Sequence, residues 1–325
     1  MIRSSGSGSD VRLELYGGDY EHTIGLDGQY GNLHVDYFPR PVVEIFREMI
    51  SRRAFAACEM SLANYVVMRD RGARWLTALP IFPFRAFRHG AIYVRADSGL
   101  SRLSDVLGLR MGVPDYGMTA AVWVRGILKS EYGVSWDSLR WYSRASRIPL
   151  PAALQVDRLS HPLGVALENH EIDAAVSTTK LVGTTNPLRR LLSDPATVER
   201  EYFGKTGIFP IMHVVVVKQD ALDRHPDIAT GLFSAYVSSK RSALQRRLSR
   251  ALHPWGYLHW ETVDEHFGGD PLPHGLSALN RRAITVFLEF LRDQRLINDL
   301  PHLESLFADG SIALSEVEAH SDVGR

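Results

Sequence analysis

The sequence places a carboxylate and a hydroxyl at the point where a predicted strand becomes a helix. Glu59 and Ser61 follow the short apolar run 55–58 and precede the helical pattern 62–71. A carboxylate there could take up or donate a proton, and a serine that caps a helix can present its hydroxyl and nearby backbone N–H groups to an anion. A plain N-cap serine beside a solvated glutamate would explain the same residues, so both interpretations stay open.

A second segment combines positive charge with aromatic rings. Arg85, Arg88 and His89 lie among phenylalanines in the loop 82–90, where the chain is expected to cross from one lobe to another. Guanidinium groups bind carboxylates through two parallel hydrogen bonds, and aromatic side chains can cover the faces of a ring. The segment therefore favours an aromatic carboxylate as ligand, with a structural charge network at the hinge as the alternative.

A third segment joins a predicted strand over 109–113 to a predicted helix. It consists of Tyr116, Gly117, Met118 and Thr119, and we expect Thr119 to cap the helix. Backbone N–H groups in a glycine-containing turn and the N-terminus of a helix both attract anions. The turn therefore predicts a second group of donors for substrate oxygens.

A histidine marks the fourth segment. His213 lies in the apolar run 209–217, which has the pattern of a strand covered on both faces. A lone histidine beside such a run is often a core residue, and this is the alternative to a catalytic role. If the two crossing segments of the chain lie side by side, His89 and His213 face one cleft.

These residues would be positioned by strands and helices that alternate along the whole chain, which is the pattern of an α/β protein. The alternation runs through a first region, continues in a second, and returns to the first with the strand at 209–217. Two crossings of the chain imply a cleft between two lobes. We predict a flexible tail over residues 1–10, a first lobe from 11–95 and 206–325, and an inserted second lobe from 96–205.

The composition excludes several classes of protein. The 37 Lys and Arg residues balance 37 Asp and Glu residues, so binding of nucleic acid or of a membrane surface through bulk positive charge is not expected. Cys58 is the only cysteine, which excludes an intramolecular disulfide and a cysteine-based zinc site. With no signal-peptide core and no apolar run of about 20 residues, we expect a cytoplasmic protein without a membrane partner.

Longer sequence motifs around the four segments, together with one near residues 270–281, resemble those of the 4,5-dihydroxyphthalate decarboxylase family. The motifs are Cys58-Glu-Met-Ser-Leu-Ala-Asn-Tyr65, Phe82-Pro-Phe-Arg-Ala-Phe-Arg-His89, Val113-Pro-Asp-Tyr-Gly-Met-Thr-Ala-Ala-Val-Trp-Val-Arg-Gly126, Thr206-Gly-Ile-Phe-Pro-Ile-Met-His213, and Asp270-Pro-Leu-Pro-His-Gly275 with Asn280-Arg281. The resemblance implies a type II periplasmic-binding-protein-like fold, with the second lobe inserted in the first and a ligand cleft between them. It also implies conversion of 4,5-dihydroxyphthalate, a small aromatic dicarboxylate, to protocatechuate and CO2.

Loss of an aromatic carboxylate requires a proton donor at the ring carbon, a base at the phenol and cations for the carboxylate that stays. From position and chemistry, we assign proton donation to His89 or His213. We assign the phenol to Glu59, and the retained carboxylate to Arg85 and Arg88. These assignments are hypotheses from residue type and are not inherited from the family.

The remaining substrate oxygens would be held by Ser61 and the turn 116–119. The substrate supplies its own electron push, so no cofactor is expected, although a divalent metal on the catechol stays open, as does a homo-oligomer. The competing function is a non-catalytic binding protein for an aromatic carboxylate, similar to those of ABC transporters. For uptake, such a protein would be expected to carry a signal peptide or a lipid-anchor cysteine, and neither is recognised in the sequence.

Overall fold

The first lobe is built on a mixed sheet. The computed structural model describes residues 2–4, 11–246 and 255–316. The strand order of the first sheet is β3–β4–β2–β5–β13–β6, and β1 pairs with β2. The strands are β1 (Ile2–Ser4), β2 (Val11–Gly17), β3 (Gly28–Tyr30), β4 (Leu33–Pro39), β5 (Ala57–Ser61), β6 (Leu76–Leu79) and β13 (His213–Lys218).

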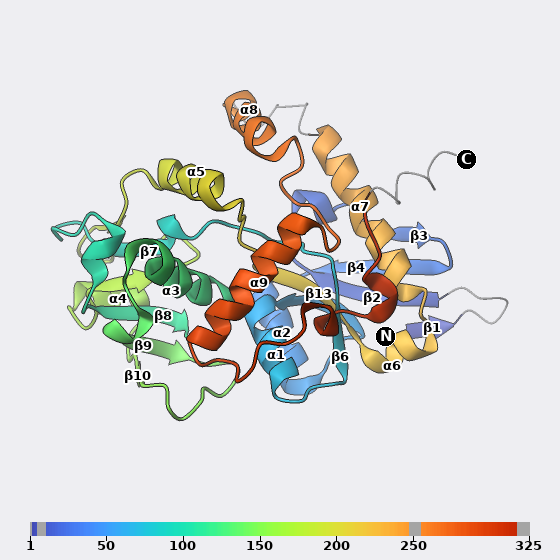
Figure 1. Cartoon of the computed structure of the whole chain (residues 1–325), viewed down its shortest axis with the longest axis horizontal. Helices are drawn as coiled ribbons and strands as arrows, with labels where there is room; N and C mark the ends of the chain where they lie inside the picture. Colours follow the sequence, from blue (N-terminus) through green and yellow to red (C-terminus); the bar gives the residue numbers. More distant parts are fainter. Residues whose placement is uncertain (1, 5–10, 247–254, 317–325) are drawn as a thin grey trace.

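Helices cover both faces of this sheet, which explains why its central strands are buried (Figure 1). All five residues of β5 are buried, and the four valines of β13 are fully buried between β5 and β6. The prediction of a strand covered on both faces is therefore confirmed for β13. The helices of this part of the chain are α1 (Val42–Arg52), α2 (Leu62–Asp70), α6 (Gln219–Arg224), α7 (Ile228–Arg246), α8 (Gly256–Phe267) and α9 (Ala278–Asp293).

The second lobe contains a separate sheet with the order β10–β9–β8–β11–β7–β12. Strands β8, β9, β10 and β11 run parallel to one another, whereas β7 is antiparallel to both β11 and β12. The elements are β7 (Ile92–Arg95), β8 (Arg110–Asp115), α3 (Thr119–Tyr132), β9 (Arg140–Ala145), β10 (Val156–Arg158), α4 (Leu163–Glu168), β11 (Ala174–Val176), β12 (Leu188–Arg190) and α5 (Pro195–Thr206).

Two details of the predicted domain division differ from the sheets. Strand β7 pairs within the second sheet, so the chain has crossed before residue 92 and not at 95. Residues 2–4 of the predicted tail form β1, because β5 covers only Leu15 and Tyr16 of the neighbouring edge of β2 and leaves the edge at 11–13 free to pair. The rest of the predicted tail lies outside the described residues.

The two crossing segments lie side by side between the lobes. The backbone of Ala86 donates to the carbonyl of Pro210, and the carbonyl of Phe84 accepts from the backbone N–H groups of Met212 and His213. An isolated β-bridge joins Arg85 to Ile211 in the same region. These hydrogen bonds form a short two-stranded connection between the two sheets.

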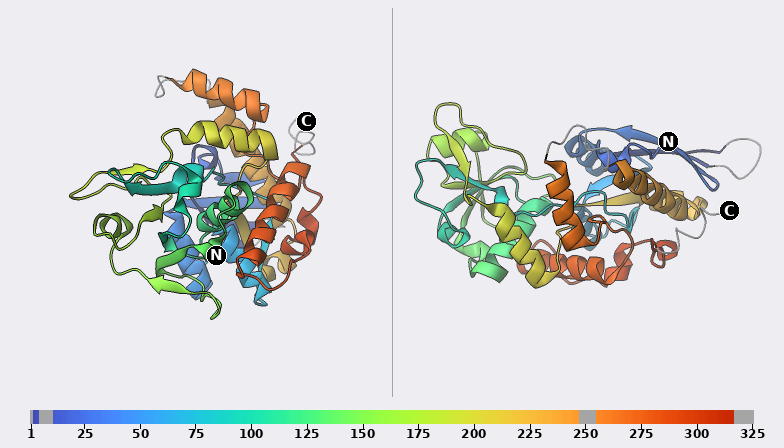
Figure 2. Two further views of the ribbon diagram at one scale, coloured as in Figure 1. Left: turned by 60° about the vertical axis from the view of Figure 1, so that its left-hand side comes forward. Right: turned by 90° about the horizontal axis from the view of Figure 1, so that it is seen from above.

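Helix α9 adds a third link between the lobes, and it runs across the middle of the molecule toward α3 (Figures 1 and 2). The indole of Trp123 on α3 stacks on Phe287 of α9 with ring centroids 5.2 Å apart. Gly126 lies against Phe290, and a Cβ at this position would overlap the phenylalanine ring. The side chain of Gln294 donates to the carbonyl of Val122 at 3.0 Å.

Each sheet has a point where the strand order reverses, and these points face each other. In the first sheet, the chain continues from β2 to β4 on one side and to β5 on the other; in the second, it continues from β8 to β9 and then to β11. Ligands of open α/β sheets bind outside the carboxyl ends of strands at such points. The Ser61 hydroxyl, after β5, lies 2.9 Å from the Thr119 hydroxyl, after β8. The predicted site is therefore expected where these two edges meet.

Candidate active site

Glu59 is a buried carboxylate held by three donors. Its side chain has no exposed area. Oε2 accepts from the backbone N–H of Gly18 at 2.8 Å, while Oε1 accepts from the Tyr20 hydroxyl at 2.8 Å and lies 2.5 Å from Nδ1 of His213. The carboxylate points into the protein with both oxygens occupied. This arrangement differs from the expected base at a substrate phenol and fits a residue that acts through His213.

The pairing of β5 with β13 explains why Glu59 and His213 meet, although they are far apart in the sequence. In the antiparallel register, Glu59 lies opposite Val215 and His213 lies opposite Ser61. Residues two apart in a strand point to the same face, so Glu59 and His213 are diagonal neighbours on one face of the sheet. Diagonal neighbours lie within reach of each other when both side chains are long.

His213 keeps one ring nitrogen available. Because its Nδ1 donates to the Glu59 carboxylate, the neutral ring carries its proton on Nδ1 and leaves Nε2 as the acceptor. Among the described residues, no partner binds Nε2, and the side chain is 14% exposed. The ring stacks on Phe84 at 5.1 Å and meets the edge of Phe46 at 5.0 Å. An oriented, partly exposed imidazole of this kind suits proton transfer.

The turn after β2 completes this group, and sequence reasoning missed its residues. The Gly18 carbonyl accepts from the Tyr37 hydroxyl at 2.6 Å and from the Thr23 hydroxyl at 3.0 Å. A Cβ on Gly18 would overlap the Tyr20 ring, and a Cβ on Gly17 would lie 2.6 Å from the Tyr37 hydroxyl oxygen. Both glycines are therefore required by close approach, and the Gly-Gly pair at the end of the first strand was the available signal.

Burial keeps the Tyr20 hydroxyl protonated. Desolvation, followed by the nearby charge of Glu59, raises the pKa of Tyr20 well above its usual value. The tyrosine can therefore donate to the carboxylate throughout the physiological pH range. Its ring also stacks on Phe84 at 5.5 Å, on the same aromatic residue that packs against His213.

Arg88 supplies a positive charge beside this aromatic group. Its Nε donates to the sulfur of Met212 at 3.2 Å, and its guanidinium carbon lies 6.0 Å from the Phe84 ring centroid. Only 8% of the residue is exposed. Desolvation lowers the pKa of Arg88 to about 10, and the charge of Glu199 opposes this shift, so the group stays charged at pH 7. Within the described chain, its Nη groups have no hydrogen-bond partner, which leaves them available for an anion.

Arg85 is placed differently from Arg88. Its Nη2 donates to Asn280 Oδ1 at 2.6 Å and to the carbonyl of Pro273 at 2.9 Å, and its Nη1 donates to the carbonyl of Phe209 at 3.4 Å. Desolvation lowers the pKa of Arg85 to about 9. The guanidinium therefore joins the hinge to α9 and to the segment before it, as in the alternative of a structural network. The expected pair of arginines around one carboxylate is not formed.

His89 does not share the surroundings of His213. The residue is 2% exposed, and its ring packs against Tyr202 of α5 at 4.8 Å. Among the described residues, neither ring nitrogen has a hydrogen-bond partner. Desolvation lowers the pKa of His89 to about 4, so the ring is neutral at pH 7 and a poor proton donor. The structure does not bring His89 into the Glu59 and His213 group.

Ser61 has the simpler of its two expected roles. Its hydroxyl accepts from the backbone of Asn64 at 3.4 Å and thereby caps α2. The backbone N–H of Leu62 donates to the carbonyl of Met212, and that of Ala63 donates to the Thr119 hydroxyl. Because these donors are already used inside the protein, the start of α2 offers little to an external anion. Its hydroxyl instead joins the two lobes.

The turn before α3 is also occupied by protein groups. Met118, and not Thr119, is the N-cap residue of α3, and its side chain makes no capping bond. The Thr119 hydroxyl instead reaches the first lobe, as described above. The Gly117 N–H donates to Asp115 Oδ1 at 3.0 Å, and the Met118 N–H donates to the Asp115 carbonyl at 3.2 Å. Tyr116 is 1% exposed, with the Arg125 guanidinium 3.9 Å above its ring.

Comparison with known proteins decides the family. A 4,5-dihydroxyphthalate decarboxylase of Comamonas testosteroni is 31% identical over 257 residues, which cover 73% of this chain and 77% of that enzyme. The chain belongs to the 4,5-dihydroxyphthalate decarboxylase family. A second member of this family, from Pseudomonas putida, is 35% identical over 144 residues, or 41% of this chain and 56% of that protein. No family model matches the chain.

Solved structures show that this decarboxylase-family chain has the predicted fold. The periplasmic aliphatic sulphonate binding protein SsuA from Escherichia coli aligns over 91% of the chain with a TM-score of 0.53 and 12% identity. The desulfurization enzyme DszB aligns over 95% of the chain with a TM-score of 0.52 and 15% identity. The two-lobed, type II periplasmic-binding-protein-like fold is thus confirmed.

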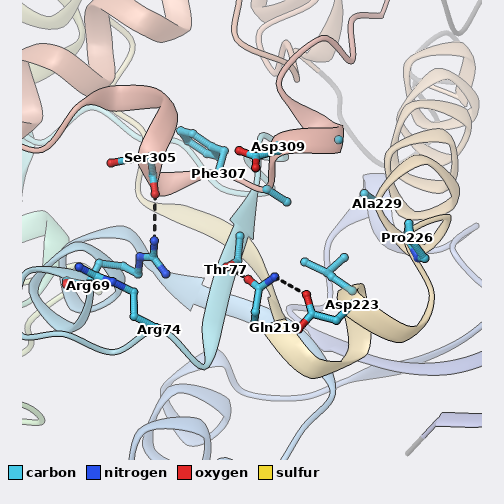
Figure 3. A pocket seen from close by; sticks show the side chains of 13 residues that line it. Arg69, Arg74, Thr77, Gln219, Asp223, Pro226, Ala229, Ser305, Phe307 and Asp309 are labelled. Atoms are coloured by element: carbon cyan, nitrogen blue, oxygen red, sulfur yellow. Dashed lines mark hydrogen bonds between the residues drawn. The ribbon is translucent and has the colours of Figure 1, made fainter.

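A pocket of the structure lies away from the group formed by Glu59 and His213. A pocket of about 590 Å³ on the first lobe is lined by Arg69, Arg74, Gln219 and Phe307, among others, and it contains none of the predicted site residues (Figure 3). In the part of the chain that the structure describes, no three His, Cys, Asp or Glu side chains are grouped to hold a metal ion. Over the same residues, no helix is both long and apolar enough to span a membrane.

Proposed function

We propose that the protein removes one carboxylate from 4,5-dihydroxyphthalate and releases protocatechuate and CO2. The observation that carries this proposal is the imidazole of His213, which is oriented by Glu59 through Nδ1 and has no partner at Nε2 among the described residues. Membership of the decarboxylase family supports it. Phe84 connects His213 to Arg88, so a proton donor, an aromatic surface and a cation lie in one group.

The chemistry follows from the need to avoid a free aryl anion. His213, as the imidazolium, donates its Nε2 proton to the ring carbon that carries the departing carboxylate. The hydroxyl para to that carbon releases its proton to solvent at the same stage, so the ring becomes a dienone in place of a ring cation. The bond to the carboxylate then breaks, its electron pair returns to the ring, CO2 leaves, and the phenolate takes up a proton. The net reaction consumes one proton for each CO2 released.

The other residues of the group support this step in different ways. Glu59 stabilises the positive charge on His213 and fixes the direction of Nε2. Gly18 and Tyr20 hold the carboxylate in place, which makes them positioning groups. Arg88 binds the carboxylate that stays on the ring, and the face of Phe84 packs against the substrate. Each expected ligand comes from an element at the carboxyl edge of the first sheet or from the crossing segments.

The first experiment follows both products with purified protein treated with EDTA. We expect release of CO2 and protocatechuate in equal amounts without added metal. The His213→Gln protein should lose activity by about 100-fold or more, because a general acid contributes that much to the rate. His34→Gln is the matched control, because His34 is a partly exposed histidine of the same sheet and faces Asp36.

The results separate the two candidate functions. Turnover that survives in His213→Gln would exclude this residue as the proton donor. Absence of turnover with and without divalent metal, together with binding of aromatic dicarboxylates in a thermal-shift screen, would indicate a binding protein. Turnover that requires metal would replace the cofactor-free scheme.

A further inference from the structure

A second guanidinium is held at the edge of the second lobe that faces this group. Nη1 of Arg147 donates to Asp115 Oδ2 at 2.9 Å, and the Arg147 backbone N–H approaches the same oxygen at 3.3 Å. The Asp115 side chain is 4% exposed and that of Arg147 is 21% exposed. Nε and Nη2 of Arg147 have no hydrogen-bond partner among the described residues. A buried acid therefore fixes an arginine that still has free donors.

The location of this ion pair connects it to the first lobe. Asp115 ends β8 and Arg147 follows the end of β9, and these two strands are parallel, so both residues lie at the carboxyl edge of the second sheet. Asp115 Oδ1 accepts from Gly117, whose carbonyl accepts from Asn64 of α2 at 3.5 Å. The pair thus lies at the edge that meets the first lobe, beside the point where the strand order reverses.

Arg88 and Arg147 differ in whether a carboxylate of the protein neutralises their charge, and this difference matters for binding an ortho-dicarboxylate. Arg88, on the crossing segment, forms no ion pair with any carboxylate of the described residues, whereas Arg147 is paired with Asp115. Two neighbouring carboxylates on one ring require two separate cationic ligands, because one planar guanidinium fork matches one carboxylate. A ligand held between the lobes can receive one from each side.

We propose that Arg147 is the second-lobe ligand of the second carboxylate and that it selects dicarboxylates over monocarboxylates. The proposal rests on the proposed function for the identity of the substrate. Asp115 is the positioning residue that holds the guanidinium in place. Asp115 already offsets the charge of Arg147, so the substrate carboxylate at Arg147 is held by oriented hydrogen bonds more than by net charge. This suits the carboxylate that must leave as neutral CO2.

The test measures dissociation constants for phthalate and benzoate by calorimetry. We expect Arg147→Met to weaken phthalate binding by about tenfold or more, the value of a lost charge-assisted hydrogen bond, and to change benzoate binding by less than about twofold. Arg110→Met is the matched control, because Arg110 makes a similar ion pair with Asp173 at the other end of β8. Arg147→Lys keeps the charge but loses the fork, and should recover only part of the affinity for phthalate.

The outcomes are distinct from those of the activity assay. Equal losses for the two ligands, the same loss in Arg110→Met, or no preference of the unaltered protein for phthalate would overturn the role of Arg147. Far-UV circular dichroism of each variant identifies loss of folding; if Arg147→Met does not fold, the Arg147→Lys comparison decides. If the ligand preference behaves as expected but 4,5-dihydroxyphthalate is not converted, the decarboxylase function fails and the dicarboxylate site stands.

Discussion

Glu59 and His213 illustrate how a single hydrogen bond can assign roles to two residues. The side chain of His213 is partly exposed, whereas that of Glu59 is fully buried. Only the histidine can therefore contact a ligand. Residue types identified both as candidates from the sequence. The sequence could not predict which of them contacts the ligand and which positions the other. That depends on which strand is central and which side chain points toward the interlobe edge.

Replacing Glu59 tests this order. Glu59→Gln keeps an acceptor for Tyr20 but removes the charge opposite His213, so we expect kcat to fall by about 100-fold or more with little change in KM. Glu59→Asp should recover part of kcat. Steady-state kinetics on 4,5-dihydroxyphthalate provide the measurement, and a large rise in KM alone would indicate direct substrate contact.

The two arginines of the hinge are expected to fail in different ways. Arg88→Met should strongly reduce ligand-induced stabilisation, which reaches about 3 kcal/mol at 100 times Kd, and leave the unliganded protein folded. Arg85→Met removes the donor from Asn280 and two carbonyls, and should lower the free energy of unfolding by about 2 kcal/mol. Thermal unfolding with and without phthalate distinguishes these effects. The opposite pattern would exchange the two roles.

His89 should affect the dependence of stability on pH. Burial lowers the pKa of its ring from 6.5 to about 4. Because the unfolded chain binds this proton more tightly, the contribution of His89 to stability is complete above about pH 6.5 and is lost as the pH falls toward 4. In His89→Gln, the fall should be shallower by about 1.4 kcal/mol per pH unit. Urea unfolding over this range measures the slope, and an unchanged slope would refute the expectation.

At the scale of elements, close packing between α3 and α9 depends on the absence of one side chain. Gly126→Ala would press a methyl group into the Phe290 ring, and we expect a loss of about 1–3 kcal/mol in unfolding free energy. Gly204→Ala, also within a helix, meets no atom within 4 Å and should be neutral or stabilising by up to about 1 kcal/mol. Equal effects of the two substitutions in chemical denaturation would argue against tight packing of α3 on α9.

Strands and helices with strong periodicity could be predicted from the sequence, and elements that depend on tertiary contacts could not. The apolar run that became β13 indicated a buried strand by composition alone. Helix α8 lies in a stretch rich in Trp, His, Gly and Pro and contains no buried residue. Its last residue, Phe267, stacks on Phe203 of α5 at 4.5 Å, a contact that no local pattern encodes. Tyr20 and Tyr37 were missed for the same reason, because they converge on Gly18 only after β2 pairs with β4 and β5.

For the whole molecule, the α3–α9 interface should make the two lobes unfold together. Arg125 is fully buried, and its Nε donates to Gln294 at 2.6 Å. Gln294→Ala leaves this buried donor without a partner and removes the hydrogen bond to the Val122 carbonyl, so we expect a loss of about 1–3 kcal/mol. Tryptophan fluorescence and far-UV circular dichroism should show the same shifted midpoint. Separate transitions would indicate that the lobes are independent.

The two-lobed architecture was predictable because strand and helix alternate and the chain returns to its first lobe. The point of crossing was placed too late, since the extended segment from β6 to β7 carries no mark of which sheet each end will join. Hydrogen bonds between Ala86 and Pro210 and between Phe84 and Met212 decide this, and they form between segments far apart in the chain.

The position of β13 has a consequence for biosynthesis. Strands β5 and β6 are made early, but β13 separates them in the sheet and is made only after the whole second lobe. The second sheet is continuous in the sequence and has all its strands by residue 190. During translation, the inserted lobe is therefore the first that can complete its sheet. The sheet of the first lobe lacks its strand between β5 and β6 until β13 has been synthesised. The hydrogen bond between Glu59 and His213 can form only when β13 pairs with β5.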